Sequence, residues 1–387
     1  MSERNSFRVF AVLLMGTLCL GMATVSRAAS TEELLKTLKN VGREGQGNVA
    51  AAKALQELTQ KDADVLPEIL KAFEGAGPLA INWLRGGFET IADKSIKQKE
   101  PLPTKELKSF IENTKQDRNA RRLAFEWLRK VEPQTAEQMV PSFLNDPSAE
   151  LRREAVAKLL KEAKAIEEKE SPRLAVAVYK KALSGAVDED QVKEIVAPLK
   201  KLGEKVDLPK HFGFLTDWQI IGPFENRGGV GFAAVYPPEK GVDLSETYET
   251  KFDDGFEGGK VGWNAFQTGD EYGVVNIRTD IKNYKGSCMY ATTTFESDKD
   301  QTVQLRLGTP NAWKLWVNGK EVFAREEYHR GTKMDQYRVS ADLKKGENEI
   351  LVKVCQNEQT QDWAQRYQFQ LRVCDPAGSA ILPANAK

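Results

Sequence analysis

The chain has 387 residues, of which 41% are hydrophobic and 29% charged, so it is long enough for two or three domains with ordinary apolar cores. Its 56 basic and 56 acidic residues give a formal net charge of zero. This balance argues against a nucleic-acid-binding protein, and no polybasic stretch favours an anionic membrane surface.

The N-terminus has the order of segments that is typical of a secretory signal peptide. A basic lead, MSERNSFR, is followed by the 17-residue apolar run VFAVLLMGTLCLGMATV and by small residues at Ser26 and Ala28. We predict a signal peptide over residues 1–28, cleaved after Ala28 or Ala29. The alternative is an uncleaved membrane anchor, for which this glycine-interrupted run has only marginal length. Leu18 is too bulky to precede a lipidated Cys19.

Cleavage would leave 53 basic and 55 acidic residues and no further stretch that could span a bilayer. We therefore expect an exported protein, located in the periplasm, at the cell surface or outside the cell.

Residues 30–206 read as successive helices rich in Ala, Leu, Lys and Glu. Ser30 and Glu33 have the spacing of a capping box at the first helix. The segments AINWLR (80–85) and AFEWLR (124–129) are similar, and small residues recur at Ala80, Ala124 and Ala155. Periods of about 30 to 45 residues indicate a degenerate helical-repeat solenoid, with a plain helical bundle as the alternative. Trp83 and Trp127 are expected in its core.

Two segments of this half resemble known repeats. DPSAELRREAVAKLLKEA (146–163) resembles a HEAT repeat, and residues 175–203 are closer to a tetratricopeptide-type helical pair. The resemblance implies an α-helical solenoid with a concave surface that binds a protein partner.

From residue 207 the period of the hydrophobic pattern changes from helical to alternating. Five segments predict half-buried strands, separated by turn residues: 302–308, 314–323, 336–343, 348–355 and 367–374. We predict an antiparallel β-sandwich over residues 207–382 and a short tail at 383–387. The fold class is therefore a multidomain α + β chain, with helices first and strands second.

Three motifs of the second half resemble the galactose-binding-like jelly roll. They are LWVNGKEV (315–322), HRG (329–331) and ADLKKGENEILVKV (341–354), in the order found in the non-catalytic sugar-binding domain of family 2 glycoside hydrolases. TDWQIIGPFEN (216–226) and YPPE (236–239) resemble the opening of such domains in large exported bacterial proteins. The resemblance covers about residues 212–382 and implies a domain that binds a glycan or an envelope component.

The sequence offers no recognisable catalytic motif. The two histidines, His211 and His329, are 118 residues apart, and no cluster has zinc-ligand spacing. NRGGVGF (226–232) lacks the strand–helix context of a phosphate loop. FDDGFEGG (252–259) could place carboxylates around Ca²⁺, but a solvated turn is favoured. With no catalytic barrel following the sandwich, we expect a non-enzymatic protein without a cofactor or metal.

Two alternatives stay open at this point. One is a purely structural envelope protein whose sandwich packs on its repeats, and the other is a hydrolase with an unrecognised pair of carboxylates.

Asn318-Gly319 predicts a two-residue hairpin turn. The register then pairs Leu315 with Val322 and Lys314 with Phe323, so that Trp313 and Leu315 face the core. The candidate ligand-binding residues are those on the opposite face and in the next loop: Trp316, Lys314, Phe323, Tyr328, His329 and Arg330. The alternative is that this second face is covered by a loop, the helical half or a partner.

Three cysteines remain after export, namely Cys288, Cys355 and Cys374. Strand alternation places Cys355 and Cys374 on the sides of their strands opposite the core. They are a candidate disulfide if those two strands pair, although simple hairpin register does not place them directly across from each other.

Overall fold

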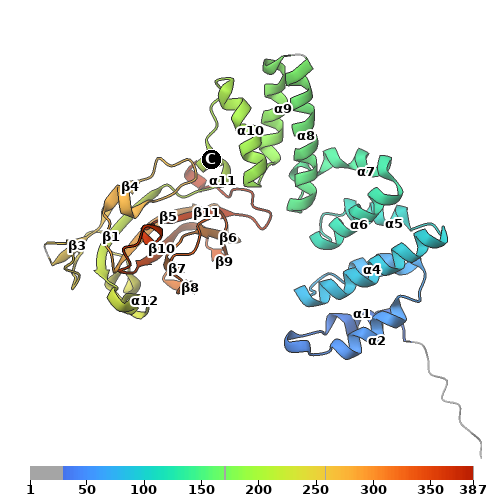
Figure 1. Cartoon of the computed structure of the whole chain (residues 1–387), viewed down its shortest axis with the longest axis horizontal. Helices are drawn as coiled ribbons and strands as arrows, with labels where there is room; N and C mark the ends of the chain where they lie inside the picture. Colours follow the sequence, from blue (N-terminus) through green and yellow to red (C-terminus); the bar gives the residue numbers. More distant parts are fainter. Residues whose placement is uncertain (1–28, 170, 258, 387) are drawn as a thin grey trace, which may run out of the picture. The chain divides into compact units, whose positions relative to one another are not determined.

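The computed structural model describes residues 29–169, 171–257 and 259–386. The predicted signal peptide lies outside these residues. The described chain consists of a helical N-terminal half followed by antiparallel β-sheets (Figure 1), which confirms the predicted fold class. Within the described ranges, no helix combines the length and the apolar character needed to cross a membrane.

The helical half begins as predicted. Ser30 Oγ accepts a hydrogen bond from Glu33 N at 3.2 Å, and Glu33 Oε2 accepts one from Ser30 N at 2.8 Å, which completes the capping box. The helices that follow are α1 (Thr31–Lys39), α2 (Asn48–Leu58), α3 (Leu66–Lys71), α4 (Pro78–Gln98), α5 (Thr104–Glu112), α6 (Arg118–Val131), α7 (Pro133–Met139), α8 (Ala149–Lys169), α9 (Pro172–Gly185), α10 (Glu189–Lys201) and α11 (Leu208–Phe212).

Backbone contacts divide the described residues into two compact units, with the boundary between Pro103 and Thr104. In the first unit α1 packs on α2 and α4, and α3 packs on α4. The second unit holds the helices from α5 onward and all the strands. There α5, α6 and α7 pack in succession, as do α8, α9 and α10.

The HEAT-like segment is organised around Asp146. Its carboxylate accepts two hydrogen bonds of 2.7 Å from the buried Arg121 guanidinium and one of 2.8 Å from the backbone N–H of Ser148, the residue just before α8. Arg152 donates to the Asp146 carbonyl at 2.9 Å. The Asp-Pro motif therefore joins α6 to the start of α8 through fully paired, charge-assisted hydrogen bonds.

The recurring alanines lie at buried helix contacts, since Ala80, Ala124 and Ala155 are each at most 2% exposed. Trp127 is also buried, which confirms its assignment to the core. Trp83 is only half-buried, so the repeat pattern overstated its burial.

The strands form two main antiparallel sheets. A six-stranded sheet has the order β4-β1-β5-β10-β7-β8, a three-stranded sheet has the order β11-β6-β9, and β2 pairs with β3. Their bounds are β1 (Asp217–Glu225), β2 (Thr247–Glu249), β3 (Lys260–Gly262), β4 (Asn264–Gln267), β5 (Ser287–Ser297), β6 (Gln301–Gly308), β7 (Ala312–Val317), β8 (Lys320–Arg325), β9 (Tyr337–Leu343), β10 (Gly346–Gln356) and β11 (Gln370–Cys374).

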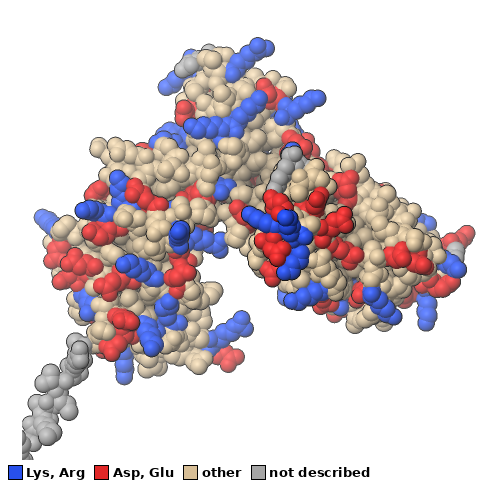
Figure 2. Space-filling view, turned by 180° about the vertical axis from the view of Figure 1, so that it is seen from behind, with Lys and Arg blue, Asp and Glu red and all other residues tan. Residues whose placement is uncertain are grey.

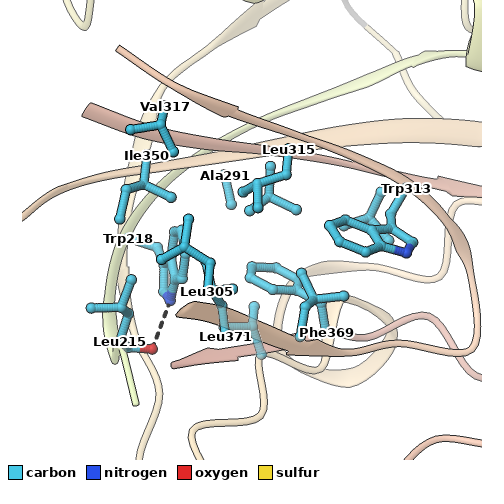
Figure 3. Close-up of a cluster of buried hydrophobic side chains, with 14 of the residues drawn as sticks. Leu215, Trp218, Ala291, Leu305, Trp313, Leu315, Val317, Ile350, Phe369 and Leu371 are labelled. Atoms are coloured by element: carbon cyan, nitrogen blue, oxygen red, sulfur yellow. Dashed lines mark hydrogen bonds between the residues drawn. The ribbon is translucent and has the colours of Figure 1, made fainter. Parts of the chain in front are cut away.

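The sandwich core lies between the two main sheets. Trp313 and Leu315 of β7, Leu305 of β6 and Phe369 are fully or almost fully buried there (Figure 3). Trp218 Nε1 donates a hydrogen bond of 3.1 Å to the Leu215 carbonyl, which satisfies the indole inside the apolar core. Trp313 is therefore a core residue, as predicted.

The six-stranded sheet is covered on its outer face as well. Residues 226–257, which we call the cover segment, include α12 (Val230–Ala233) and the 3₁₀ turn η5 (Pro237–Lys240). Aromatic residues of this segment pack on a second apolar cluster that contains Cys288, Tyr290, Trp316 and Cys355. The sheet is thus buried on both faces at its centre.

A buried lysine anchors the cover segment. Lys353 Nζ on β10 donates to the carbonyls of Phe232 and Ala234 and lies 2.8 Å from Glu239 Oε1. The Lys353 side chain is 0% exposed and the Glu239 side chain 6% exposed. The Tyr290 hydroxyl also donates to Glu239. All three N–H donors of the Lys353 ammonium group are therefore bonded to the cover segment.

Candidate functional site

The predicted hairpin is present with one change of register. Asn318 and Gly319 have positive φ values of 51° and 74°, as the turn requires. Leu315 pairs with Phe323 instead of Val322, because the register shifts between Leu315 and Trp316. This irregularity turns Phe323 toward the core, where its ring stacks 4.9 Å from Trp313. Phe323 therefore does not share a face with Trp316, contrary to the prediction.

Trp316 faces away from the sandwich core, as predicted, but it is only 5% exposed. The cover segment shields it, so its ring offers no open platform to a ligand. Lys314 is shielded too: its Nζ lies 5.0 Å from the centre of the Phe232 ring and 3.5 Å from Glu321 Oε2. The alternative of a face covered by a loop is the arrangement observed.

Tyr328 and His329 lie in the loop between β8 and β9, where they meet the loop between β10 and β11. His329 Nε2 is 2.7 Å from Asn357 Oδ1, and its ring lies 5.1 Å from Trp363 at an interplanar angle of 89°. Trp363 is 62% exposed. We call Tyr328, His329, Asn357, Glu358 and Trp363 the aromatic loop site.

Trp363 is held outward by its neighbours in the 3₁₀ turn η7 (Asp362–Ala364). Ala364 is fully buried, and its carbonyl accepts hydrogen bonds from Gln356 Nε2 at 3.1 Å and Lys285 Nζ at 2.7 Å. The backbone beneath the indole is therefore fixed before any ligand arrives, which lowers the entropic cost of binding there.

The opposite side of the site is tied to the start of the cover segment. The buried Asn226 donates from Nδ2 to the Tyr328 hydroxyl at 3.2 Å and to the Gln356 carbonyl at 2.9 Å. Gly228 N donates to Glu358 Oε1 at 2.9 Å. Burial raises the pKa of the Tyr328 hydroxyl above its ordinary value of about 10. Three loops thus converge on the aromatic loop site.

His329 has a positive φ of 57°, an unusual conformation for a residue with a side chain. Sparsely populated backbone conformations cost free energy and concentrate at functional sites. The hydrogen bond to Asn357 and the contact with Trp363 hold His329 in this backbone conformation.

Arg330, the last candidate from the sequence, lines a separate open pocket of about 540 Å³. Arg325, Glu327 and Lys333 also line this pocket, and Arg330 Nη2 lies 3.3 Å from Glu327 Oε1. Arg330 is exposed and adjacent to His329 in the chain, so it flanks the aromatic loop site.

A second pocket, of about 650 Å³, lies on the outer face of the six-stranded sheet. Its polar lining includes Asp217 and Gln219 of β1, Thr292 of β5 and Glu349 of β10. Burial raises the pKa of the Glu349 carboxyl. Two carboxylates thus face one pocket from strands on either side of β5.

The predicted pairing of Cys355 with Cys374 is wrong. Cys355 belongs to β10 of the six-stranded sheet and Cys374 to β11 of the three-stranded sheet, and these strands do not pair. Both thiols face away from the core, as predicted. Because the two strands lie in opposite sheets, this orientation places the thiols on opposite outer faces of the sandwich.

Within the described residues, no group of three or more His, Cys, Asp or Glu side chains is placed to hold a metal ion. Asp253, in the segment considered for calcium, is exposed and lies 2.9 Å from Arg227 Nη1.

No family model matches the chain, and no curated protein matches it either. Among solved structures, the chain is similar to β-glucosidase from Kluyveromyces marxianus in complex with glucose (15% identity, TM-score 0.22), over 29% of this chain and 14% of that one. The selenomethionine-labelled form of that enzyme matches at 11% identity and TM-score 0.26, over 46% and 21% of the two chains.

The PA14 domain of the antifreeze protein MpAFP matches at 11% identity and TM-score 0.20, over 25% of this chain and 47% of that one. All three matches span less than half of the similar chain. With TM-scores this low, nothing about the ligand of the present chain follows from these matches.

Trp363 is the residue that sequence reasoning missed. It lies within QNEQTQDWAQRYQFQ (356–370), a polar stretch rich in Gln between two strands. The residues before this tryptophan are all polar, so no hydrophobic period assigns its ring to a core, and this was the available signal of an exposed ring.

Proposed function

We propose that this chain is an exported, non-enzymatic binding protein whose sandwich binds a glycan at the aromatic loop site. The observation that carries the proposal is Trp363, a large aromatic side chain that is 62% exposed on an anchored turn. Exposed tryptophan is uncommon on a surface that binds nothing, and it is enriched at binding surfaces.

The chemistry of the site suits a sugar ring. The face of an indole carries partial negative charge, which attracts the weakly positive C–H edges of a pyranose. The amide of Asn357 and the carboxylate of Glu358 offer donors and acceptors for hydroxyl groups beside the ring. His329 contacts Trp363 with the two rings perpendicular to each other.

In the same proposal, the helical half binds a protein partner through its repeats. The support is the repeat-like succession of helices and the mixed charge of the surface. Figure 2 shows Lys and Arg interspersed with Asp and Glu over the described residues on the face drawn, without a large area of one sign. Such a surface suits a protein partner better than a nucleic acid.

A glycan array tests the sandwich part of the proposal. The fluorescently labelled full-length chain should bind one or a few related glycans, and Trp363→Ala should lose at least tenfold in apparent affinity. Leu174→Ala is the control, because Leu174 is an apolar side chain that is 59% exposed on α9 of the helical half. Equal binding by wild type and Trp363→Ala would contradict the assignment of the site.

One observation favours a second candidate, the structural envelope protein. Helices α8 to α11 share an apolar cluster with Phe214, Tyr272 and Met334 of the β-region, so the sandwich packs on these helices within the second unit. A chain that binds no glycan on the array while remaining folded would favour this candidate.

The pocket containing Asp217 and Glu349 favours a third candidate, a glycoside hydrolase. Two carboxyl groups, one with a raised pKa, are the minimum that such chemistry needs. Incubation of the protein with soluble polysaccharides should release no reducing sugar. Release that disappears in Glu349→Gln would overturn the non-enzymatic proposal.

A further inference from the structure

Cys288 and Cys355 form a pair that takes no part in the proposed glycan site. They are direct partners in the antiparallel register of β5 and β10. Opposed residues of this kind have Cα atoms about 4.5–5.5 Å apart, inside the range of roughly 4.4–6.8 Å that disulfides span. The two Sγ atoms are in contact at 2.9 Å.

Cys374 provides the contrast within the same sandwich. Its Sγ lies 3.7 Å from the Gln304 carbonyl of the neighbouring strand β6, and no cysteine stands opposite it. Of the cysteines in the described residues, only Cys288 and Cys355 face each other.

We propose that Cys288 and Cys355 form a disulfide when the chain folds in an oxidising compartment, and that Cys374 remains a thiol. The inference rests on the expected export of the chain but not on glycan binding. Two central strands of the six-stranded sheet would thereby be joined beneath the cover segment.

The reaction is thiol–disulfide exchange with a small-molecule or protein disulfide as oxidant. The thiolate of one cysteine attacks a sulfur of the oxidant, which forms a mixed disulfide and expels one thiolate. The second cysteine then attacks the mixed disulfide, and the other half of the oxidant leaves as a thiolate. The protein loses two protons and two electrons, and the oxidant is reduced to two thiols.

Burial determines when this exchange takes place. Both thiols are 0% exposed, and a Cβ added at Gly231 of α12 would lie 2.7 Å from Cys288 Sγ. The backbone of the cover segment therefore rests directly on the cysteine pair. The oxidant must reach the thiols before the cover segment docks, and afterwards the same segment shields the bond from reductants.

Refolding followed by peptide mapping tests the inference. The full-length protein is unfolded, refolded with a mixture of reduced and oxidised glutathione, treated with N-ethylmaleimide and digested without reduction. Mass spectrometry should find a linked peptide that contains Cys288 and Cys355, together with maleimide on Cys374. Maleimide on both Cys288 and Cys355, or a link that includes Cys374, would overturn the inference.

Two variants sharpen the result. Cys374→Ser should keep the link, because that residue takes no part in it. Cys288→Ser should abolish the link and leave Cys355 modified by maleimide. The wild-type peptide map decides the question even if Cys288→Ser fails to fold.

Discussion

Asp335 is the counter-charge of two buried arginines in the sandwich. Its carboxylate lies 2.6 Å from Arg306 Nη1 and 2.6 Å from Arg372 Nε. Arg372 in turn donates to the carbonyls of Phe212 at 3.1 Å and Gly378 at 2.9 Å. Burial alone would raise the pKa of Asp335, but the two arginines outweigh it and the pKa is lowered.

We expect Asp335→Asn to destabilise the protein by about 3–5 kcal/mol at pH 7, because it leaves two buried guanidinium groups without a counter-charge. Urea unfolding followed by circular dichroism measures this loss. Asp254→Asn, at an exposed position, is the control. A loss below about 1 kcal/mol would contradict the role given to Asp335.

The lowered pKa of the Asp335 carboxyl also predicts that the stability of the fold depends on pH in the acid range. A carboxyl group with a lowered pKa in the folded state stabilises the fold above its unfolded pKa of about 3.9. This stabilisation is lost as the pH falls through the folded pKa. The difference in stability between wild type and Asp335→Asn should therefore shrink as the pH is lowered below about 4. A constant difference down to pH 2 would argue against it.

Trp316 and Trp363 show what could be predicted for single residues. Alternation around the hairpin placed Trp316 on the face opposite the core, and this is correct. Its burial could not be predicted, because the covering residues lie 60 to 90 positions earlier in an irregular segment. Trp363 has no periodic context at all, since its exposure follows from the anchoring of Ala364 by Gln356 and Lys285.

At the scale of elements, the cover segment is held by the Lys353–Glu239 pair. We expect Glu239→Gln to loosen this segment, because Lys353 then keeps a buried charge without its partner. Trp316 would become accessible to solvent, which acrylamide quenching of tryptophan fluorescence would detect as an increase.

The double variant Lys353→Met with Glu239→Gln controls for the loss of the pair. Replacing both charges is less harmful than removing one, so its unfolding free energy should lie closer to wild type than that of Glu239→Gln. A double variant less stable than either single variant would contradict this account.

The alternating hydrophobic pattern of the sequence predicted some strands better than others. The segments around β6 to β11 alternate, because one face meets the core and the other is partly polar, and all were confirmed. β5, with the sequence SCMYATTTFES, is buried on both faces over its first half and so has no period of two. One of the two central strands of this sheet thus left the weakest signal in the sequence.

At the scale of the whole chain, the compact units do not follow the change from helices to strands. Phe212 and Phe214 share an apolar cluster with Tyr179 and Leu199, and Arg152 Nη1 donates to Ser379 Oγ at 2.7 Å. The sequence indicates where helices give way to strands, but not which helices pack on the sheets. The Arg152–Ser379 hydrogen bond, for example, joins residues 227 positions apart and leaves no local pattern.

This packing predicts where limited proteolysis should cut the chain. Trypsin should cut first near the exposed Lys99, between α4 and α5, and leave a resistant fragment that begins near Thr104 and holds both helices and strands. Mass spectrometry of the fragment identifies the cut. A stable fragment that begins after Lys201 or Lys205 would show instead that the sandwich is independent of the helices.

The most direct test of the central claim is affinity electrophoresis in native gels containing xylan, mannan, β-glucan, galactan or pectin. We expect at least one polysaccharide to retard wild type and Leu174→Ala equally, while Trp363→Ala migrates as it does without polysaccharide. Retardation of Trp363→Ala to the same extent as wild type, or no retardation in any gel, would contradict glycan binding at the aromatic loop site.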